Sequence, residues 1–209
     1  MRVLIADDHQ MFREGLKEIL LSDPDISVVE EAGDGQEVLN LVLKNKYDVV
    51  IMDISMPGRN GLEILQELKV EKPEIQVLML SMYNEEQFAV QAIKAGASGY
   101  LTKNGAAREV LAALRKIASG GMFISAAVAQ ELASELKGDR EKAPHSKLSP
   151  REYQVMRLIA SGRSNAEMAA ELSISPSAVS THRARILTKM NLKTNADIIR
   201  YAIKRGLVE

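Results

Sequence analysis

The chain has 209 residues, of which 46% are hydrophobic and 26% charged, with a net charge of −1 and no cysteine. This length suits two ordinary domains, and the missing cysteine excludes disulfides, thiolate metal sites and a cysteine nucleophile. Asp7 and Asp8 interrupt the first apolar run too early for a signal peptide, and no stretch approaches the roughly 18 apolar residues of a membrane helix. We therefore expect a cytoplasmic protein with no membrane contact.

Short apolar runs alternate with amphipathic helical patterns over the first 119 residues. The predicted strands are Arg2–Ala6, Ile26–Glu31, Tyr47–Met52, Gln76–Leu80 and Gly99–Leu101. The predicted helices are Gln10–Leu21, Gly35–Lys44, Gly61–Val70, Glu85–Ala95 and Ala106–Ser119. Strands that alternate with helices of this length predict an α/β domain whose parallel sheet is covered on both faces.

The alternation stops at Gly120-Gly121. Ala126–Leu136 could form one more helix, and Lys137–Ser146 is polar and contains a glycine and a proline, which is typical of a hinge. We therefore predict a first domain over residues 1–120, a linker over 121–146 with a helix at 126–136, and a second domain over 147–209.

From Leu148 onward the pattern is purely helical, and the helix starts are well marked. Ser149–Glu152 and Ser164–Glu167 are capping boxes, and Thr194–Asp197 is a looser relative of them. Ser175-Pro176 combines a cap with a proline at the first helical position. Four short helices joined by sharp turns predict a small all-α helix-turn-helix domain.

The near-neutral total charge hides an asymmetry between the two halves. Residues 1–145 carry 16 Lys and Arg against 23 Asp and Glu, a net charge of −7. Residues 146–209 carry 11 against 5, a net charge of +6. The basic half is therefore a candidate for binding nucleic acid.

Charged residues stand at the carboxyl ends of three predicted strands. Asp7 and Asp8 follow the first strand, Asp53 follows the third and Lys103 comes soon after the fifth. Ligands of an open parallel sheet bind outside the carboxyl ends of its strands, so we expect the four side chains to converge. Crowded carboxylates repel one another unless a cation lies between them, and Mg²⁺ prefers oxygen ligands. The joint occurrence predicts a magnesium site beside a carboxylate nucleophile, although each residue alone would suggest only a helix-start acid or a surface lysine.

The first 120 residues resemble the receiver domain of two-component response regulators. The resemblance rests on Asp7-Asp8, on Asp53 within Ile-Met-Asp-Ile-Ser-Met-Pro-Gly, on Ser81, and on Lys103 within Leu-Thr-Lys. It implies a doubly wound, flavodoxin-like sheet of five parallel strands in the order 2-1-3-4-5. It also implies that a histidine kinase phosphorylates Asp53 with the help of Mg²⁺.

The same resemblance gives the ligands of the metal and the groups that face the phosphoryl oxygens. Asp8, Asp53 and the backbone carbonyl of Ser55 would hold Mg²⁺, and Asp7 would act through a water. Lys103 supplies a positive charge to the phosphoryl oxygens, and the hydroxyl of Ser81 (after the fourth strand) donates to them.

Ser81 and Tyr100 match the family's switch positions. Phosphorylation would move the Ser81 side toward the phosphoryl group and turn Tyr100 inward, which would remodel the surface around Met82–Tyr100 and Thr102–Ser119. A half-buried strand tyrosine with no such role is the alternative for Tyr100. The expected outcome is a change in domain contacts or dimerisation.

Three segments of the basic half resemble the LuxR-type helix-turn-helix, namely Leu148–Glu152, Ala160–Glu167 and Val179–His182. Together with the receiver, they make nearly the whole chain resemble a NarL/FixJ-type response regulator. The resemblance implies a scaffold helix at Asn165–Leu172 and a recognition helix at Pro176–Met190. It also implies a double-stranded DNA operator as a partner, with RNA polymerase as a further candidate.

Helical geometry divides the recognition helix into two faces. Val179, His182, Ile186 and Met190 should pack inward. The residues expected to approach DNA are Ser177, Ser180, Thr181, Ala184, Arg185 and Thr188 on the outward face, with Arg183, Lys189 and Lys193 toward phosphates on the flanks. Many relatives carry Lys where Ser180 stands, so one module should bind modestly, and we expect a phosphorylation-favoured homodimer on paired half-sites.

Two other functions stay open at this point. An Asp-nucleophile phosphohydrolase would use the same nucleophile and metal, but it needs a second acid two residues further on, where this chain has Ser55. We therefore expect no enzyme, beyond slow loss of the protein's own phosphoryl group. The helical half could instead bind protein or RNA, as a receiver-controlled interaction module.

Overall fold

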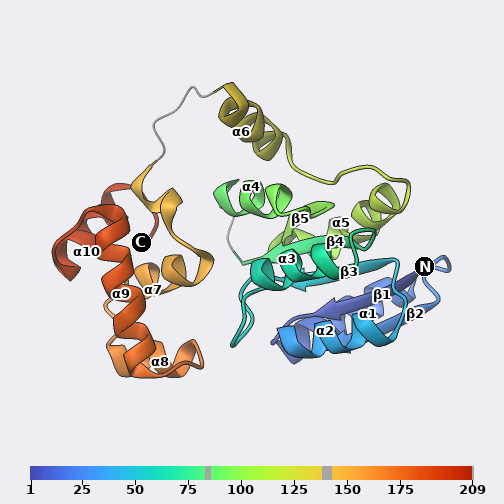
Figure 1. The fold of residues 1–209 in the computed structure, drawn as a ribbon, viewed down its shortest axis with the longest axis horizontal. Coiled ribbons are helices and arrows are strands. Elements are labelled where there is room, and N and C mark those ends of the chain that lie inside the picture. The colour runs from blue at the N-terminus through green and yellow to red at the C-terminus, as the bar shows by residue number, and fades with distance from the viewer. Residues whose placement is uncertain (83–85, 138–142, 209) are drawn as a thin grey trace. The chain divides into compact units, whose positions relative to one another are not determined.

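The structure, a computed structural model, describes residues 1–82, 86–137 and 143–208 (Figure 1). The chain divides into two compact units, residues 1–139 and residues 140–209. In the described part of the chain, no helix combines the length and the apolar composition that crossing a membrane requires.

The first unit alternates parallel strands with helices. Its elements are β1 (Arg2–Ala6), α1 (Gln10–Leu21), β2 (Val28–Ala32), α2 (Gly35–Lys44), β3 (Val49–Asp53), α3 (Gly61–Glu71), β4 (Gln76–Ser81), α4 (Glu86–Lys94), β5 (Gly99–Thr102), α5 (Lys103–Ala118) and α6 (Ala126–Lys137). The five strands form one parallel sheet in the order β2-β1-β3-β4-β5, which confirms the predicted fold class.

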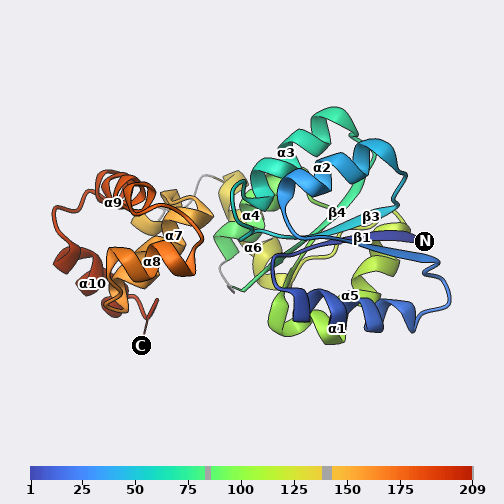
Figure 2. The same cartoon turned by 90° about the horizontal axis from the view of Figure 1, so that it is seen from below.

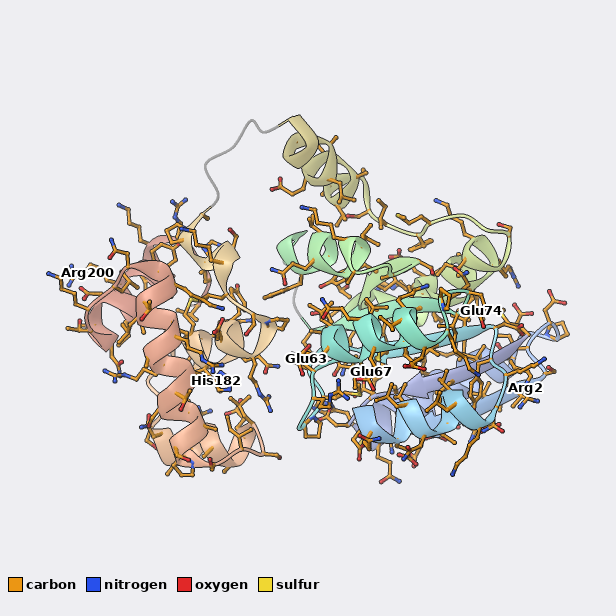
Figure 3. All side chains as sticks on the ribbon, viewed as in Figure 1. Arg2, Glu63, Glu67, Glu74, His182 and Arg200 are labelled. Atoms are coloured by element: carbon orange, nitrogen blue, oxygen red, sulfur yellow. The ribbon has the colours of Figure 1, made fainter. Side chains whose placement is uncertain are left out.

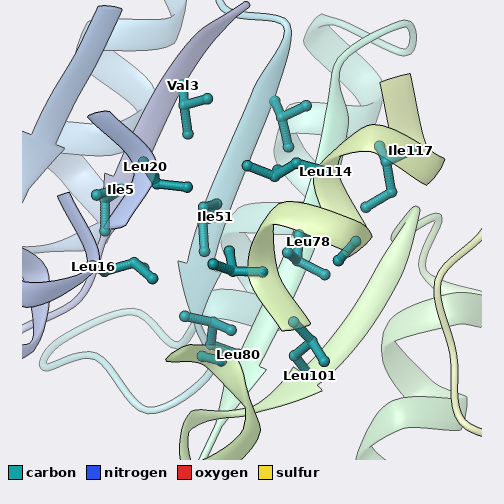
Figure 4. Packing of buried hydrophobic residues seen from close by; sticks show 14 of the residues in the cluster. Val3, Ile5, Leu16, Leu20, Ile51, Leu78, Leu80, Leu101, Leu114 and Ile117 are labelled. Atoms are coloured by element: carbon teal, nitrogen blue, oxygen red, sulfur yellow. The ribbon is translucent and has the colours of Figure 1, made fainter. Parts of the chain in front are cut away.

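Helices cover both faces of this sheet, α1 and α5 on one side and α2 and α3 on the other (Figure 2). On the face that α1 and α5 cover, β1, β3, β4 and β5 contribute buried apolar side chains that form one continuous core (Figure 4). Its strand members are Val3, Ile5, Val49, Ile51, Leu78, Leu80 and Leu101. Burial on both faces explains why the central strands have continuous apolar sequences instead of alternating ones.

The register of the central strands places their carboxyl ends level with one another. Ala6 of β1 pairs with Met52 of β3, and Asp53 pairs with Leu80 of β4. The residues that follow Ala6 and the last residue of β3 therefore lie side by side at one edge of the sheet.

Some element boundaries differ from the sequence prediction. β2 begins at Val28 rather than Ile26, because Ile26 N–H donates to Asp23 O in a turn. α5 begins at Lys103 rather than Ala106, since Thr102 Oγ1 accepts the N–H of Gly105 and so caps the helix three residues earlier. Residue 85, the predicted start of the fourth helix, lies outside the described residues.

The segment after α5 stays attached to the sheet. Tyr100 N–H donates to Phe123 O at 2.9 Å, and Phe123 N–H donates to Ser98 O at 3.1 Å, so Phe123 covers the open edge of β5. α6 follows at the predicted place and packs against α4. Of the predicted hinge at Lys137–Ser146, residues 138–142 lie outside the described residues.

The second unit is helical throughout its described part. It contains the 3₁₀ turn η1 (Pro144–Lys147) and helices α7 (Pro150–Ala160), α8 (Asn165–Glu171), α9 (Pro176–Met190) and α10 (Asn195–Lys204). Both hydrogen bonds of the capping box are present at Ser149, Ser164 and Thr194, and Ser175 caps α9. Asn191 ends α9 in the left-handed conformation, with φ of 54°.

Candidate functional site

Two buried carboxylates and one buried ammonium meet at the carboxyl edge of the sheet. Asp7 follows β1, Asp53 is the last residue of β3, and Lys103 is the first residue of α5. Lys103 Nζ lies 2.6 Å from Asp7 Oδ2 and 2.8 Å from Asp53 Oδ2. Both aspartates are fully buried and the lysine side chain is 4% exposed. The predicted convergence of these residues is therefore present in the structure.

Burial and charge act against each other in this group. Burial raises the pKa of Asp53 and the Asp7 carboxylate raises it further, so the pKa is above its ordinary value although Lys103 opposes the shift. Burial lowers the pKa of Lys103, but the two carboxylates together outweigh it and the pKa is raised. Asp53 is thus poorly solvated, and its contact with Lys103 favours the charged form of both groups.

Asp8 and His9 extend the group toward solvent. His9 Nδ1 lies 2.8 Å from Asp8 Oδ1 and 3.1 Å from Asp7 Oδ1, and both Asp8 and His9 are exposed. One potential ligand atom from each of Asp7, Asp8, His9 and Asp53 lies within 4.8 Å of the others. Asp53 Oδ1 is buried without a hydrogen-bond partner in the described part of the chain, which is the environment a bound cation would complete. The donors therefore fit a divalent cation.

Ser81 and Tyr100 lie on the two strands next to this group. Ser81 ends β4, is fully buried and pairs with Thr102, so it stands at the same edge of the sheet as Asp53. Tyr100 is 7% exposed on β5. The hydroxyl of Ser55, two residues beyond Asp53, is buried without a partner among the described residues.

Three neighbours of the site were not identified from the sequence. The Phe12 ring centroid lies 5.0 Å from Lys103 Nζ, and His9 contacts both Asp7 and Asp8. A Cβ on Gly61 would lie 2.1 Å from Asp53 O, so only glycine lets the start of α3 approach β3 this closely. The Asn60-Gly61 dipeptide was a possible signal for a close approach, whereas Phe12 and His9 carry none.

In the second unit, α9 buries one face and exposes the other. Val179 and Ile186 are fully buried and Met190 is 4% exposed. His182, which Figure 3 labels, lies on the same helix and is half-buried. Burial lowers the pKa of His182, and its Nδ1 has no partner among the described residues. The six residues predicted to face outward are all exposed: Ser177, Ser180, Thr181, Ala184, Arg185 and Thr188.

The polar groups of this face differ in their availability. The hydroxyls of Ser180, Thr181 and Thr188 each donate to the backbone carbonyl four residues earlier, at 3.0–3.1 Å, so their oxygens remain as acceptors. Arg185 is exposed without an acidic partner among the described residues, and so is Lys193.

The two flanking cations Arg183 and Lys189 contact the rest of the unit. Lys189 Nζ lies 2.7 Å from the buried Glu152 of α7, and Arg183 Nε donates to Asn195 Oδ1 of α10. Both were predicted to contact phosphates, and the structure gives each a partner inside the unit.

Comparison with known families gives two matches. Residues 3–115 match the model described as response regulator receiver domain, and residues 146–202 match the one described as bacterial regulatory proteins, luxR family. Together these matches span most of the chain.

Relatives match over almost the entire length. The chain is 35% identical to the response regulator UvrY of Escherichia coli K12, over 99% of this chain and 95% of the relative. It is 34% identical to the oxygen regulatory protein NreC of Staphylococcus epidermidis, over all of both chains. Among solved structures, the chain is similar to the RcsB response regulator of Salmonella typhimurium, with 26% sequence identity and a TM-score of 0.62. The alignment covers 96% of this chain and 98% of the RcsB chain.

Proposed function

Because this chain belongs to the two-component response regulators with a LuxR-type DNA-binding domain, we propose that a histidine kinase phosphorylates it on Asp53 and thereby controls its binding to DNA. The observation that carries this proposal is the double contact of Lys103 Nζ with Asp7 and Asp53. Among the described residues, Asp53 Oδ1 has no hydrogen-bond partner, and it lies beside this fixed positive charge.

Phosphoryl transfer depends mainly on position and on stabilisation of charge. Asp53 supplies the attacking oxygen, and Lys103 and Ser81 face the oxygens of the transferred group. Asp7, Asp8, Asp53 and the backbone carbonyl of Ser55 would hold Mg²⁺, which neutralises developing negative charge when bound. The supporting observations are that Asp53 is buried and that the oxygens of the three aspartates lie close together.

The signal would leave the site through β4 and β5. Phosphorylation adds about −1.5 to −2 charges next to Lys103. Ser81 would move toward the new charge and Tyr100 would turn inward behind it. Tyr100 N–H donates to Phe123 O in the segment after α5, and α6 packs against α4. A change in β4 and β5 can therefore alter the segment that leads to the second unit. We propose that this change on phosphorylation favours a homodimer.

The output is transcriptional regulation by binding to a DNA operator. We propose that α9 enters the major groove, with Arg185 reading base edges and Lys193 contacting a phosphate. RcsB, the structural neighbour, has been solved as two dimers bound to two parallel DNAs and bound to a promoter with the phosphomimetic BeF₃⁻. These complexes support DNA as the partner of the present chain. We further propose that the chain acts in the cytoplasm and that RNA polymerase is a second partner.

The relatives are response regulators rather than phosphohydrolases. Ser55 stands where such an enzyme needs its second acid, and a hydroxyl cannot protonate the leaving group. Many turnovers of a phosphomonoester per protein molecule would contradict this assignment.

The test uses the full chain with acetyl phosphate and Mg²⁺. Wild type should take up the phosphoryl group, and Asp53→Asn should not, because the amide is a poor nucleophile. Asp25→Asn, at an exposed position, serves as the matched control and should be labelled like wild type. Assembly state and DNA affinity are followed on the same samples. If Asp53→Asn takes up label at the normal rate, the site assignment is wrong.

A further inference from the structure

His9 stands at the N-cap of α1 without capping it. Its side chain makes no hydrogen bond to the first turn of the helix. Ser, Thr, Asp and Asn are the residues that usually stabilise this position. The imidazole turns instead to the two carboxylates that precede it in the chain. The orientation of the His9 side chain therefore results from its contacts with the acidic site and not from capping of α1.

The backbone also fixes His9 to the site. His9 N–H donates to Asp7 Oδ1 at 2.9 Å, and Arg13 Nη1 donates to the carbonyl oxygen of Asp7 at 2.6 Å. These bonds tie the start of α1 to the end of β1. The imidazole accordingly approaches the carboxylates from a fixed backbone position, although its far side is exposed.

The separations between the candidate ligand atoms are close to those of ligands around one ion. With bonds of about 2.1 Å, an octahedral ion keeps neighbouring ligands about 3.0 Å apart and opposite ligands about 4.2 Å apart, and a tetrahedral ion keeps all its ligands about 3.4 Å apart. His9 Nδ1 lies 2.8 Å from Asp8 Oδ1 and 3.1 Å from Asp7 Oδ1. Including Asp53, the four candidate ligand atoms lie within 4.8 Å of one another, slightly wider than such an ion would hold them.

A second observation points to a ligand at this place. Asp53 belongs to the same four-residue group, is fully buried and has one carboxylate oxygen without a hydrogen-bond partner in the described part of the chain. A buried orphan oxygen is unfavourable until a cation or a donor reaches it. Lys103 contacts the other oxygen of Asp53 and so leaves this one to an ion.

We propose that His9 Nδ1 joins Asp7, Asp8 and Asp53 as a ligand, so that the site binds first-row transition ions such as Zn²⁺ more tightly than Mg²⁺. Mg²⁺ is a hard ion that binds oxygen ligands, whereas imidazole nitrogen suits Zn²⁺, Co²⁺ and their neighbours. The three carboxylates serve both kinds of ion, and the imidazole favours only one. The inference concerns the metal taken by the proposed phosphoacceptor site, and in that sense it rests on the proposed function.

The chain offers a matched set of controls. It contains no cysteine and only three histidines, His9, His145 and His182. Zn²⁺ and Mg²⁺ affinities of the full chain are measured by calorimetry for wild type, His9→Asn, His145→Gln and His182→Gln. Asparagine is a good N-cap residue, so His9→Asn should keep α1 intact.

The expected result is that wild type binds Zn²⁺ at least ~10-fold more tightly than Mg²⁺. His9→Asn should weaken Zn²⁺ binding by ~10-fold or more and leave Mg²⁺ binding within about twofold, since loss of even an outer-shell partner weakens a metal site this much. The other two variants should bind both ions like wild type. With Co²⁺ as a paramagnetic probe, the ring resonances of His9 should shift strongly and those of His145 should not.

An unchanged Zn²⁺ affinity in His9→Asn would overturn the inference, as would a loss in His145→Gln or His182→Gln instead. Phosphoryl uptake from acetyl phosphate with Mg²⁺ is measured on the same samples. Weakened Zn²⁺ binding in His9→Asn, with wild-type Zn²⁺ binding in His145→Gln and His182→Gln, supports the inference. Absence of uptake in wild type would contradict the proposed function alone, because the metal affinities are read independently.

Discussion

Lys103 separates two buried carboxylates at the edge of the sheet, with Nζ within 2.8 Å of each. Lys103→Met removes the only cation of this contact and keeps most of the apolar stem. We expect the free energy of unfolding to fall by about 3–5 kcal/mol, the usual loss when one partner of a buried ion pair is removed. Urea unfolding without added metal is the measurement.

Millimolar Mg²⁺ should restore part of this loss, because an ion that binds only the folded state stabilises it. The matched control is Lys44→Met, at the exposed end of α2, which should change stability by less than about 0.5 kcal/mol. If both variants lose the same free energy of unfolding, the ion pairs of Lys103 do not stabilise the fold.

Glu152 is the corresponding buried charge of the second unit. It is 2% exposed, Lys189 Nζ lies 2.7 Å away and Ser149 N–H donates to it at 2.7 Å. Burial raises the pKa of Glu152, but these two partners together outweigh burial and hold the pKa below its ordinary value of 4.5. A carboxyl with a lowered pKa in the folded state stabilises that state above pH 4.5, and this stability is lost as the pH falls through the lower value.

Glu152→Gln should therefore lower the free energy of unfolding by about 1.5–3 kcal/mol at neutral pH, the range for hydrogen bonds to charged groups. The difference from wild type should shrink below pH 4.5, which chemical unfolding across the acid range would show. Glu171→Gln, exposed at the end of α8, is the control and should follow the wild-type profile. A constant difference at every pH would contradict the assigned ion pair.

At the scale of elements, the approach of α3 to β3 depends on one glycine. Gly61 N–H donates to Ile54 O at 2.9 Å, and an added Cβ would meet the backbone of Asp53 at 2.1 Å. Gly61→Ala must therefore push the end of β3 aside. We expect a loss of more than about 3 kcal/mol in unfolding free energy, the upper range for overpacking, and slower phosphoryl uptake by Asp53.

Gly15 provides the opposite case within the same unit. It lies in the interior of α1, and a Cβ there would meet nothing within 4 Å. Gly15→Ala should stabilise the protein by about 0.5–1 kcal/mol, since alanine loses less backbone entropy in a helix. Thermal unfolding of both variants provides the comparison. Destabilisation by both would mean that side-chain volume as such, rather than the contact with β3, is harmful.

Much of the first unit follows from local sequence pattern. The alternation of apolar runs with helical patterns predicts the parallel sheet, and Asp7, Asp53 and Lys103 meet because parallel strands end at one edge. Boundaries follow less well, because the cap at Thr102 moves the start of α5 and gives no stronger signal than its neighbours. The direction of His9 was not predictable, since an N-cap histidine can equally point into solvent.

Contacts between side chains of different helices cannot be predicted from the pattern of each helix alone. Helical geometry predicts that Lys189 lies on the flank of the outward face. It cannot show that Lys189 meets Glu152, which is 37 residues away on another helix. The number of cations available to DNA is therefore smaller than the net charge of +6 for residues 146–209 suggests. Packing between helices sets this number, which is why sequence alone overestimates it.

At the scale of the whole molecule, an acidic unit and a basic unit share one chain. Residues 1–145 carry a net charge of −7 and residues 146–209 a net charge of +6. DNA should therefore attract the second unit and repel the first. One copy of the second unit has few unpaired cations on α9 and should bind DNA modestly. Strong binding to DNA therefore needs two copies held together.

We therefore predict that dimerisation by the first unit supplies most of the affinity for paired half-sites. The phosphorylated full chain should bind DNA with two half-sites about 100-fold or more tightly than the isolated second unit, residues 140–209, because linked modules bind the second site intramolecularly. On DNA with one half-site the two proteins should differ little, and the acidic first unit should make the full chain slightly weaker. Fluorescence anisotropy at one fixed salt concentration measures both. Equal affinities on the paired site would mean that the second unit dimerises by itself and that phosphorylation acts on DNA binding by another route.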